Sequence, residues 1–486
     1  MGVCRTGGTL SAMTAQKYDT LRSASSPARR LPPAAAPALP PRPAPSPVRA
    51  FDVGWLVTLN VVVVAAMWVV HDGPGQLVGW AGWATGIGRL AALYGTLAIL
   101  ADLVLISRVP WLERRYGMDR LNLWHRWAGV AAVSLLVLHA VATTVGYAGT
   151  AVIGLWSQIV DFVMNYPNVL ASIVALAVLV AVAVTSAKSA RRALSYETWW
   201  FIHLYAYLAI ALSFSHQFAV GTDFLSDWWA RAYWALLYLM TAGALLGYRW
   251  ITPLVRSLRH RMRVVAVERE VPGVVTIVVS GTGLDRLPVE AGQFFLLRFL
   301  RRDRWWKAMP LSLSAPPNGR TLRFTVKALG DDTAAIQSVP IGTRVMAEGP
   351  YGAFTSALAS RRKVLLIGGG IGITPLRALY EDFDRRPGEV ALLYRTRSRD
   401  EAVFLDDLTR ISRARGFDLF VSYSRPLGRS VGGDPFTPDR LLAVVPDVAN
   451  RDVFVCGSAS VVVAAQSALR RVGVPSCQIH LEKFAY

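Results

Sequence analysis

The sequence predicts a multidomain protein: an all-α bundle of six transmembrane helices, then a small antiparallel β-barrel, then an α/β domain. Three features of the sequence predict this order. Long apolar segments dominate the first half, short strand-like segments between Pro and Gly turns follow, and strands alternating with helical stretches complete the chain. The expected domain ranges are 1–50, 51–252, 253–358 and 359–486.

The composition combines high hydrophobicity with a strongly basic charge. Of 486 residues, 53% are hydrophobic and only 17% are charged, yet the formal net charge is +20 and the mean hydropathy is +0.36. These values exclude a single soluble globule and predict a membrane protein with a soluble part. The three cysteines are too few for a four-cysteine iron–sulfur cluster or a disulfide scaffold.

Residues 1–50 are rich in Ala, Pro, Arg and Ser. They lack the contiguous apolar core and the cleavage site of a signal peptide. Because such a composition cannot bury a core, we expect a disordered cytoplasmic tail.

Six apolar segments follow, each with about the 20 residues that a helix needs to cross a bilayer. They span 53–70, 88–107, 125–147, 167–187, 199–219 and 228–250. The loops after the second and fourth segments carry basic residues, whereas the other three loops have no Lys or Arg and contain Asp72, Asp161, Asp223 and Asp227. The positive-inside rule predicts a multi-pass plasma-membrane protein with both termini cytoplasmic. The positive charge then reflects this sorting, so we expect anionic lipids and no nucleic acid as its neighbours.

Four of the seven histidines lie within two predicted membrane helices: His125 and His139 on the third, His203 and His216 on the fifth. Imidazoles are costly in hydrocarbon and indicate a functional site. Since both helices run in the same direction, His125 and His203 share the cytoplasmic level, and His139 and His216 lie roughly 20 Å farther out. One such histidine alone would be read as a hydrogen-bonded core residue. Two matched pairs favour two b-type haems, each with two histidines as metal ligands.

The two helices differ in histidine spacing. Fourteen residues on the third helix return to within about 40° of the same face, whereas thirteen residues on the fifth miss it by about 140°. We therefore expect a local tightening, bulge or bend near Ser213 and Ser215.

Three arginines are candidates for binding haem propionates: Arg89 and Arg231 at the outer surface, and Arg126 at the inner haem. Interfacial snorkelling is the alternative explanation for these side chains.

A glycine-rich turn opens the last domain. The segment Lys363–Pro375 contains a strand, then Gly368, Gly369, Gly370 and Gly372, then a helix start, as in a Rossmann-like nucleotide-binding domain. Glycines let the backbone approach a pyrophosphate, while Thr374 can cap the helix and Pro375 fits its first turn. Cys456-Gly457 after a later strand and Glu482 near the carboxyl terminus support this interpretation.

The next strand ends in a basic run that contains Arg395 and Arg397, with no carboxylate before Asp400. No carboxylate is therefore present to accept hydrogen bonds from the ribose hydroxyls of NADH, and the two arginines fit the 2′-phosphate of NADPH. This charge favours NADPH over NADH, although a solvated basic turn has the same composition.

Together with Met309-Pro-Leu-Ser-Leu-Ser314 and Glu348-Gly-Pro-Tyr-Gly352, these motifs resemble the ferredoxin–NADP reductase family. With the histidine pairs, residues 53–486 resemble the ferric reductase and NADPH oxidase superfamily. The resemblance implies six membrane helices that hold two b haems, an FAD-binding barrel and an NAD(P)H domain. It also implies that Ser312 lies beside the flavin N5 edge, Cys456 near the nicotinamide with Glu482 completing that pocket, and Tyr486 over the flavin face. The remaining implied contacts are, for FAD, Pro310, Leu311, Leu313, Ser314, Lys327, Gly330, Asp331 and Thr333, and, for the nucleotide, Gly457.

One departure from the family pattern concerns the flavin. Family members usually have Arg or His where this chain has Met309, and an aromatic residue where it has Leu311. A lost donor implies weaker or differently arranged FAD binding.

The implied function is electron transfer from cytoplasmic NADPH through FAD and two haems to a small acceptor outside. Acidic outer loops favour ferric iron or a ferric chelate, dioxygen giving superoxide is the main rival, and a quinone or redox protein is third. A non-catalytic membrane haem protein with a degenerate reductase module is the alternative of another class, and the intact glycine turn, Cys456 and Glu482 argue against it. The sequence indicates no partner protein.

Overall fold

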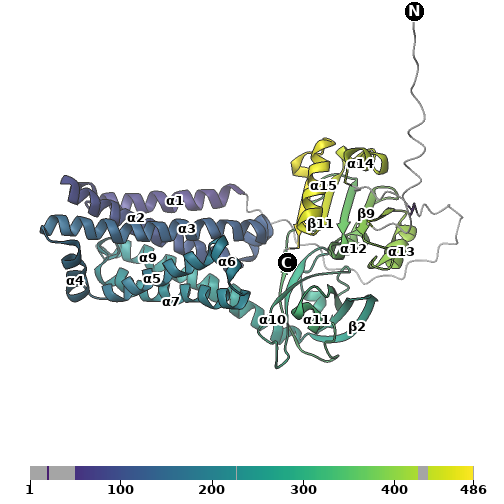
Figure 1. Cartoon of the computed structure of the whole chain (residues 1–486), viewed down its shortest axis with the longest axis horizontal. Helices are drawn as coiled ribbons and strands as arrows, with labels where there is room; N and C mark the ends of the chain where they lie inside the picture. Colours follow the sequence, from purple (N-terminus) through teal and green to yellow (C-terminus); the bar gives the residue numbers. More distant parts are fainter. Residues whose placement is uncertain (1–18, 21–49, 226, 425–435, 485–486) are drawn as a thin grey trace, which may run out of the picture. The chain divides into compact units, whose positions relative to one another are not determined.

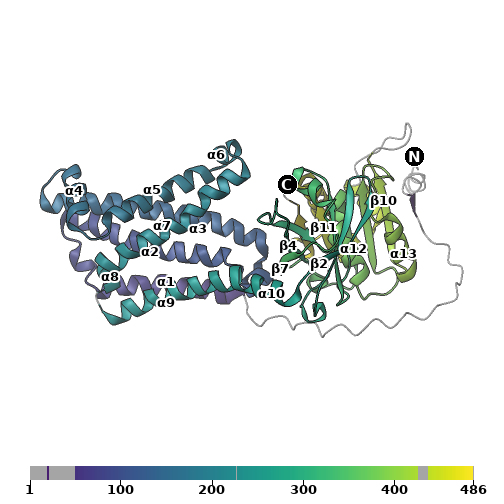
Figure 2. The same cartoon turned by 90° about the horizontal axis from the view of Figure 1, so that it is seen from below.

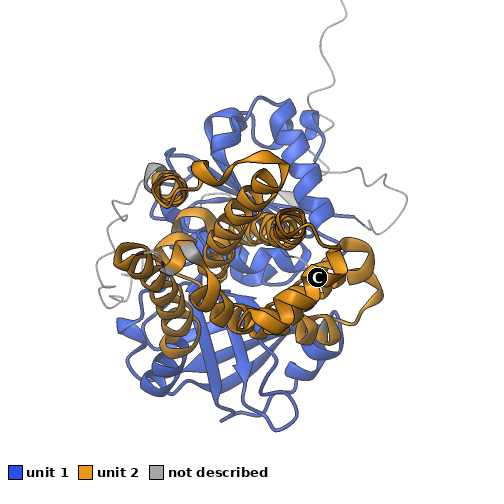
Figure 3. Ribbon diagram, turned by 90° about the vertical axis from the view of Figure 1, so that its left-hand side faces the viewer, with its two compact units in different colours: residues 1–44, 253–486 blue, residues 45–252 orange. Residues whose placement is uncertain are grey.

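The computed structural model describes residues 19–20, 50–225, 227–424 and 436–484. Figure 3 colours its two compact units, Pro45–Thr252 in orange and Pro253–Tyr486 with Met1–Ala44 in blue. The tail predicted to be disordered lies outside the described residues except for Asp19–Thr20, which forms the short strand β1.

The first unit is built from helices, which Figure 2 shows running along its length. Their bounds are α1 Ala50–Val70, α2 Gly79–Ile106, α3 Pro110–Ala151, α4 Leu155–Asn165, α5 Val169–Ser186, α6 Lys188–Ala193, α7 Tyr196–Val220, α8 Thr222–Leu225 and α9 Trp228–Ala244, followed by a π-helical stretch, Leu245–Ile251. Helix α10, Thr252–His260, comes next and belongs to the second unit from Pro253 on. Gly117 interrupts α3 with non-helical backbone angles. All six predicted segments are helical, and α4 is an additional helix that the sequence pattern did not predict.

Four helices among the described residues are long and apolar enough to cross a membrane: Val53–Val70, Gly79–Ile106, Arg120–Ala151 and Val169–Ser186. The other two predicted spans, in α7 and α9, do not reach this threshold. Helix α7 includes Glu197 and two histidines, and α9 has 17 residues before its geometry changes. A helical domain with apolar membrane helices is therefore present, while the six-helix bundle remains a prediction.

Small residues bring α2 and α3 close together. A Cβ atom on Gly146 of α3 would lie 2.7 Å from the backbone nitrogen of Thr85 and 2.9 Å from the carbonyl oxygen of Ala81 on α2. Such close approach of two backbones is how helices associate in lipid, where no hydrophobic driving force exists between them.

Two three-stranded antiparallel sheets open the second unit. One has the order β2 (Arg263–Val271), β3 (Val274–Ser280), β6 (Thr321–Lys327), and the other β5 (Met309–Ser312), β4 (Phe294–Phe299), β7 (Val345–Tyr351). Fully buried Ile277, Leu297 and Phe324 belong to the apolar core that the two sheets share. Isolated bridges, Arg263 to Arg344 and Leu313 to Phe324, connect this region, so the closed barrel of the prediction is present only as two bridged sheets.

The last domain is a parallel sheet between helices (Figure 1). Its strands are β8 Val364–Gly369, β9 Val390–Thr396, β10 Asp418–Tyr423, β11 Asp452–Gly457 and β12 Ile479–Lys483, in the order β1-β10-β9-β8-β11-β12, with β1 alone antiparallel. Helices α12 (Ile373–Asp382) and α13 (Leu405–Arg415) share one apolar core with the sheet, and α14 (Pro438–Val444) and α15 (Ala459–Arg471) share the other. The predicted parallel α/β architecture is confirmed, with β12 as an additional strand.

Shorter helical elements complete the fold. They are helix α11, Asp331–Ile336, and the 3₁₀ turns Pro74–Gln76, Leu284–Arg286, Ser356–Leu358, Gly370–Gly372, Val448–Asn450 and Ser476–Gln478.

The close approach of α2 and α3 gives a testable prediction. Gly146→Ala places a methyl group against the backbone of α2, which cannot move aside as a flexible side chain would, and this overpacking lowers stability by about 1–3 kcal/mol. Thermal unfolding of the purified protein in detergent measures the loss. Gly243→Ala in α9, where a Cβ meets nothing within 4 Å, is the matched control and leaves the unfolding temperature unchanged or raised. Equal unfolding temperatures for the two variants would contradict the packing.

Candidate functional site

The structure brings together His125 and His203, the two histidines predicted to share the cytoplasmic level. The ring centroids of His125 on α3 and His203 on α7 are 5.9 Å apart, with ring planes at 83°. Two imidazoles bound to one metal ion from opposite sides, with metal–nitrogen bonds of about 2 Å, have centroids about 6 Å apart. The separation of this pair therefore fits a shared iron.

The other ring nitrogens of this pair have partners of their own. His125 Nδ1 lies 2.8 Å from an oxygen of Asp102 on α2, and His203 Nδ1 lies 3.4 Å from the Ser186 hydroxyl. Trp199 stacks on His203 with ring centroids 5.1 Å apart. Because Nδ1 is occupied in each ring, Nε2 is the nitrogen that can ligate a metal.

The two histidines predicted for the outer level, His139 and His216, are both partly buried. His139 Nδ1 lies 2.9 Å from the carbonyl oxygen of Gly88 and 3.2 Å from the Thr143 hydroxyl. His216 interacts electrostatically with His139, and its Nδ1 is buried next to the Pro167 carbonyl without a hydrogen bond of acceptable geometry among the described residues. The Nδ1 atom of His216 thus differs from that of His139, which has two partners.

The irregularity predicted between His203 and His216 is wrong. Helix α7 is regular from Tyr196 to Val220. The hydroxyls of Ser213 and Ser215 donate to the carbonyls of Ile210 and Leu212, three residues earlier, so these side chains are satisfied without breaking the helix.

The three arginines proposed for haem propionates lie in different environments. Arg89 donates from Nε and one terminal nitrogen to the buried carboxylate of Asp223, at 2.9–3.2 Å, and also to Gln76. His71 contacts the same cluster, 3.0 Å from Asp227 and 3.6 Å from Asp223. Arg89 therefore connects α2 to the turn before it and to α8, whereas Arg126 and Arg231 are exposed.

In the second unit, Pro253–Tyr486, which we call the reductase unit after the family that its sequence resembles, three residues proposed for the nucleotide site form one row across the sheet. Cys456 on β11 pairs in register with Gly368 on β8 and with Glu482 on β12. The row lies at the carboxyl end of parallel strands, where nucleotides bind in folds of this type. Burial, and then the charge of Glu482, raise the pKa of the Cys456 thiol well above its usual value. The thiol is therefore neutral at physiological pH and is not a nucleophile. Its position beside a nicotinamide stays a prediction.

The glycine-rich turn has the geometry that the sequence predicted. Gly370 has φ 56°, and a Cβ atom on Gly372 would lie 2.5 Å from the carbonyl oxygen of Cys456, so no side chain fits there. Thr374 is not the helix cap: α12 begins at Ile373, and the Thr374 hydroxyl donates back to the carbonyl of Ile371. Pro375 lies in the first turn of α12, as expected.

The residues after the second strand are less enclosed. The Arg395 guanidinium lies 5.4 Å from the ring centroid of Phe436, and Arg397 is 65% exposed with Glu401 3.9 Å away. Gly369 and Gly457 both approach Val461, which fixes the turn against α15. Tyr486, proposed to cover the flavin, lies outside the described residues.

The flavin segment runs along β5 and the residues after it. Met309, Leu311, Ser312, Leu313 and Ser314 are buried, and Pro310 is exposed. The Ser314 hydroxyl is buried and has no hydrogen-bond partner in the described part of the chain. An unsatisfied buried hydroxyl at this position fits a segment that binds a polar ligand.

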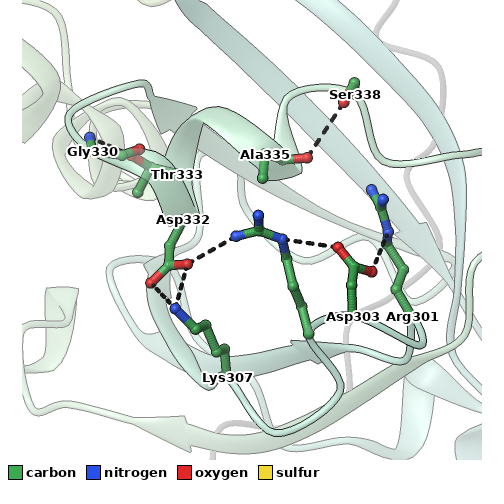
Figure 4. A network of polar contacts seen from close by, with 9 residues as sticks. Arg301, Asp303, Lys307, Gly330, Asp332, Thr333, Ala335 and Ser338 are labelled. Atoms are coloured by element: carbon green, nitrogen blue, oxygen red, sulfur yellow. Dashed lines mark hydrogen bonds and ion pairs between the residues drawn. The ribbon is translucent and has the colours of Figure 1, made fainter. Parts of the chain in front are cut away.

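The segment proposed for the FAD phosphates is held by its own polar contacts. Thr333 accepts hydrogen bonds from the backbone nitrogens of Leu329 and Gly330 at 2.9 and 3.1 Å, while Asp331 is exposed. Asp332 binds Lys307 at 2.7 Å and Arg304 at 2.9 Å. Figure 4 shows Lys307 pointing toward the Asp332 carboxylate. Arg304 and Lys307 come shortly before Met309 in the sequence. Met309 itself stands at the position where the family pattern has Arg or His.

Two residues join the flavin segment to the nucleotide domain. Lys327 on β6 lies 3.7 Å from Glu401, which follows β9. Arg377 on α12 is buried, donates to the Ser314 carbonyl at 2.6 Å and to Asp407 at 2.9 Å, and its guanidinium lies 5.3 Å from the Phe404 ring centroid. Because α12 starts at the glycine turn, Arg377 ties the nucleotide site to the flavin strand.

Sequence reasoning missed Asp102 and Arg377. Asp102 could have been found, because Arg89 and Asp102 are the only charged residues of the apolar segment 88–107. Nothing in the sequence around Arg377 distinguishes it from an exposed helix arginine.

The helical unit matches a family of known proteins. Residues 87–214 match the model of the ferric reductase like transmembrane component family, a range that contains His125, His139 and His203 and ends before His216.

The reductase unit has curated relatives. The ferredoxin reductase component of 3-ketosteroid-9-alpha-monooxygenase from Mycolicibacterium smegmatis is 31% identical over 41% of this chain and 57% of its own length. A Rhizobium meliloti flavohemoprotein is 27% identical over 36% of this chain and 47% of its own length. The putative respiratory burst oxidase homolog protein G of Arabidopsis thaliana is 28% identical over 39% of this chain and 24% of its own length. The chain is therefore similar to a ferric reductase transmembrane component in its helical unit and to reductase and oxidase proteins in its second unit.

The chain spans only part of the length of these curated relatives, from about a quarter to just over half. Among solved structures, the flavohem-like FAD/NAD-binding domain of a Vibrio cholerae nitric oxide dioxygenase aligns with 46% of this chain and 99% of its own, at 22% identity and a TM-score of 0.39.

The Arg377 contacts predict a measurable loss of stability. Arg377→Met leaves the buried Ser314 carbonyl without its charged donor and lowers the stability of the reductase unit by about 1–3 kcal/mol. Arg410→Met is the matched control, because Arg410 binds the same Asp407 but is 69% exposed, and its loss costs less than about 1 kcal/mol. Thermal unfolding of the FAD-loaded protein compares the two. An effect of Arg410→Met as large as that of Arg377→Met would refute the buried link.

Proposed function

We propose that this protein is a transmembrane flavocytochrome b oxidoreductase. It passes electrons from cytoplasmic NADPH, using FAD and two b haems, to a small acceptor outside, with ferric iron or a ferric chelate as the favoured acceptor. The observation that carries the proposal is the 5.9 Å approach of His125 and His203 in a chain that also contains a nucleotide-type reductase unit.

The electron count requires both kinds of cofactor. One NADPH gives a hydride, becomes NADP⁺ and leaves one proton in the cytoplasm, while two acceptor molecules each gain one electron outside. When bound, a flavin supplies the conversion of a two-electron donor into single electrons, and a bis-histidine haem supplies one-electron transfer.

The chain's own residues would position and insulate these groups. The four histidines are proposed to ligate iron through Nε2, with both termini of the chain in the cytoplasm. The Gly368–Cys456–Glu482 row provides a neutral thiol and a carboxylate at the expected nicotinamide position. Arg395 and Arg397 are proposed for the 2′-phosphate, which would make NADPH the preferred donor.

The choice of acceptor depends on the outer carboxylates. Asp223 is bound by Arg89, and Asp227 caps α9 through the Ala230 nitrogen while contacting His71. Two of the four acidic residues that favoured ferric iron therefore have structural roles. This observation favours dioxygen, which needs no charged site, as the second candidate.

Two assays separate the acceptors. With NADPH, ferric-chelate reduction is measured under argon, and superoxide-dismutase-sensitive dye reduction is measured in air. The ferric proposal expects full activity without oxygen. Activity that requires oxygen and is suppressed by superoxide dismutase would replace ferric iron with dioxygen.

The outer pair predicts a variant with separated activities. His139→Ala removes an outer haem ligand and abolishes reduction of an external acceptor, while NADPH oxidation by a soluble dye that takes electrons from the flavin continues. Measuring both rates on one preparation checks this. External reduction at the wild-type rate would show that His139 is not on the electron route.

A further inference from the structure

Asp102 is a carboxylate in the apolar helix α2, where an unpaired charge is costly and where such a residue indicates function. Its side chain is 16% exposed, and its oxygen lies 2.8 Å from Nδ1 of His125, which is 25% exposed. The contact orients His125 so that its Nδ1 faces Asp102 and its Nε2 is the nitrogen left for a metal.

The four candidate iron ligands differ in the hydrogen-bond partners of their Nδ1 atoms. His125 meets a carboxylate, His139 the Gly88 carbonyl, His203 the Ser186 hydroxyl at 3.4 Å, and His216 no well-formed partner among the described residues. Three of these environments are neutral. The inner pair alone has a carboxylate on a proposed ligand.

This difference has an electronic consequence. A carboxylate that accepts the Nδ1 proton makes the imidazole a more basic ligand and places negative charge near the metal. Both effects stabilise ferric over ferrous iron, because the ferric ion carries more positive charge, and so they lower the reduction potential.

We propose that Asp102 is a positioning residue that lowers the reduction potential of the inner haem below that of the outer haem. Electron transfer from the inner to the outer haem is then downhill, which gives the chain a direction across the membrane. The inference rests on the proposed function, because it requires that the two histidine pairs hold haem. Each step moves a single electron and changes no bond.

The variant that tests this is Asp102→Asn, which keeps the size and a hydrogen-bond acceptor but removes the charge. The purified haem-loaded protein is titrated with dithionite and mediators, and the haem absorption bands report the potentials without any NADPH. Wild-type protein is expected to show two components. In Asp102→Asn, the reduction equilibrium of the lower component shifts by at least tenfold, which raises its reduction potential by about 59 mV for one electron. The reduction potential of the higher component does not change.

Two controls make the result specific. Asp161→Asn removes a carboxylate on α4 that contacts Gln158 and Asn165, and it leaves both potentials unchanged. Asp102→Glu retains a carboxylate and keeps the lower component low. If Asp102→Asn loses the inner haem, the Asp102→Glu titration decides: a retained low component supports the role of the carboxylate, and a raised one refutes it.

The outcomes distinguish the two proposals. Two haems with a single shared potential, or a lower component that does not move in Asp102→Asn, overturn the role of Asp102 and leave the proposed function intact. A wild-type chain that binds no haem overturns the proposed function itself.

Discussion

Satisfying polar side chains inside hydrocarbon is the constraint on which the rest of the helical unit depends. Imidazoles and carboxylates are tolerated there only where neighbouring helices supply partners. Gly146 and Gly88 let α2 and α3 approach closely enough for His139 to reach the Gly88 carbonyl. Farther along the same two helices, Asp102 contacts His125. With those Nδ1 atoms engaged, the remaining nitrogens are available to a metal. Helix packing and the proposed cofactor binding thus depend on the same contacts.

The reductase unit depends on a comparable close approach. Gly372 lies so near the β11 backbone that no other residue fits, and this contact sets the glycine turn beside Cys456 and Glu482. Arg377 then connects the helix that begins at the turn to the Ser314 carbonyl. Nucleotide and flavin segments, although separate in sequence, are therefore held by a few buried contacts. A thiol kept neutral by burial adds no charge to that region.

The sequence predicted the organisation well, because hydropathy and strand–helix alternation are local signals. It predicted all six helical segments and most strands of the parallel sheet, and four of the segments meet the criteria for a membrane span. It predicted an irregularity in α7 that the structure does not have, so the thirteen-residue spacing leaves His203 and His216 about 140° apart around a regular helix, which counts against the paired-haem arrangement. It also predicted that Arg89 binds a haem propionate, whereas in the structure the Arg89 guanidinium forms an ion pair with Asp223. Partners distant in sequence, such as Ser314 and Arg377, leave no local pattern.

The central claim is that one chain connects a cytoplasmic nucleotide to two haems in its membrane domain. Anaerobic addition of NADPH to the purified protein, loaded with FAD and haem, tests it most directly. The account predicts reduced b-haem absorption equal to that obtained with dithionite, at two haems per chain. Flavin bleaching without any haem reduction would contradict it.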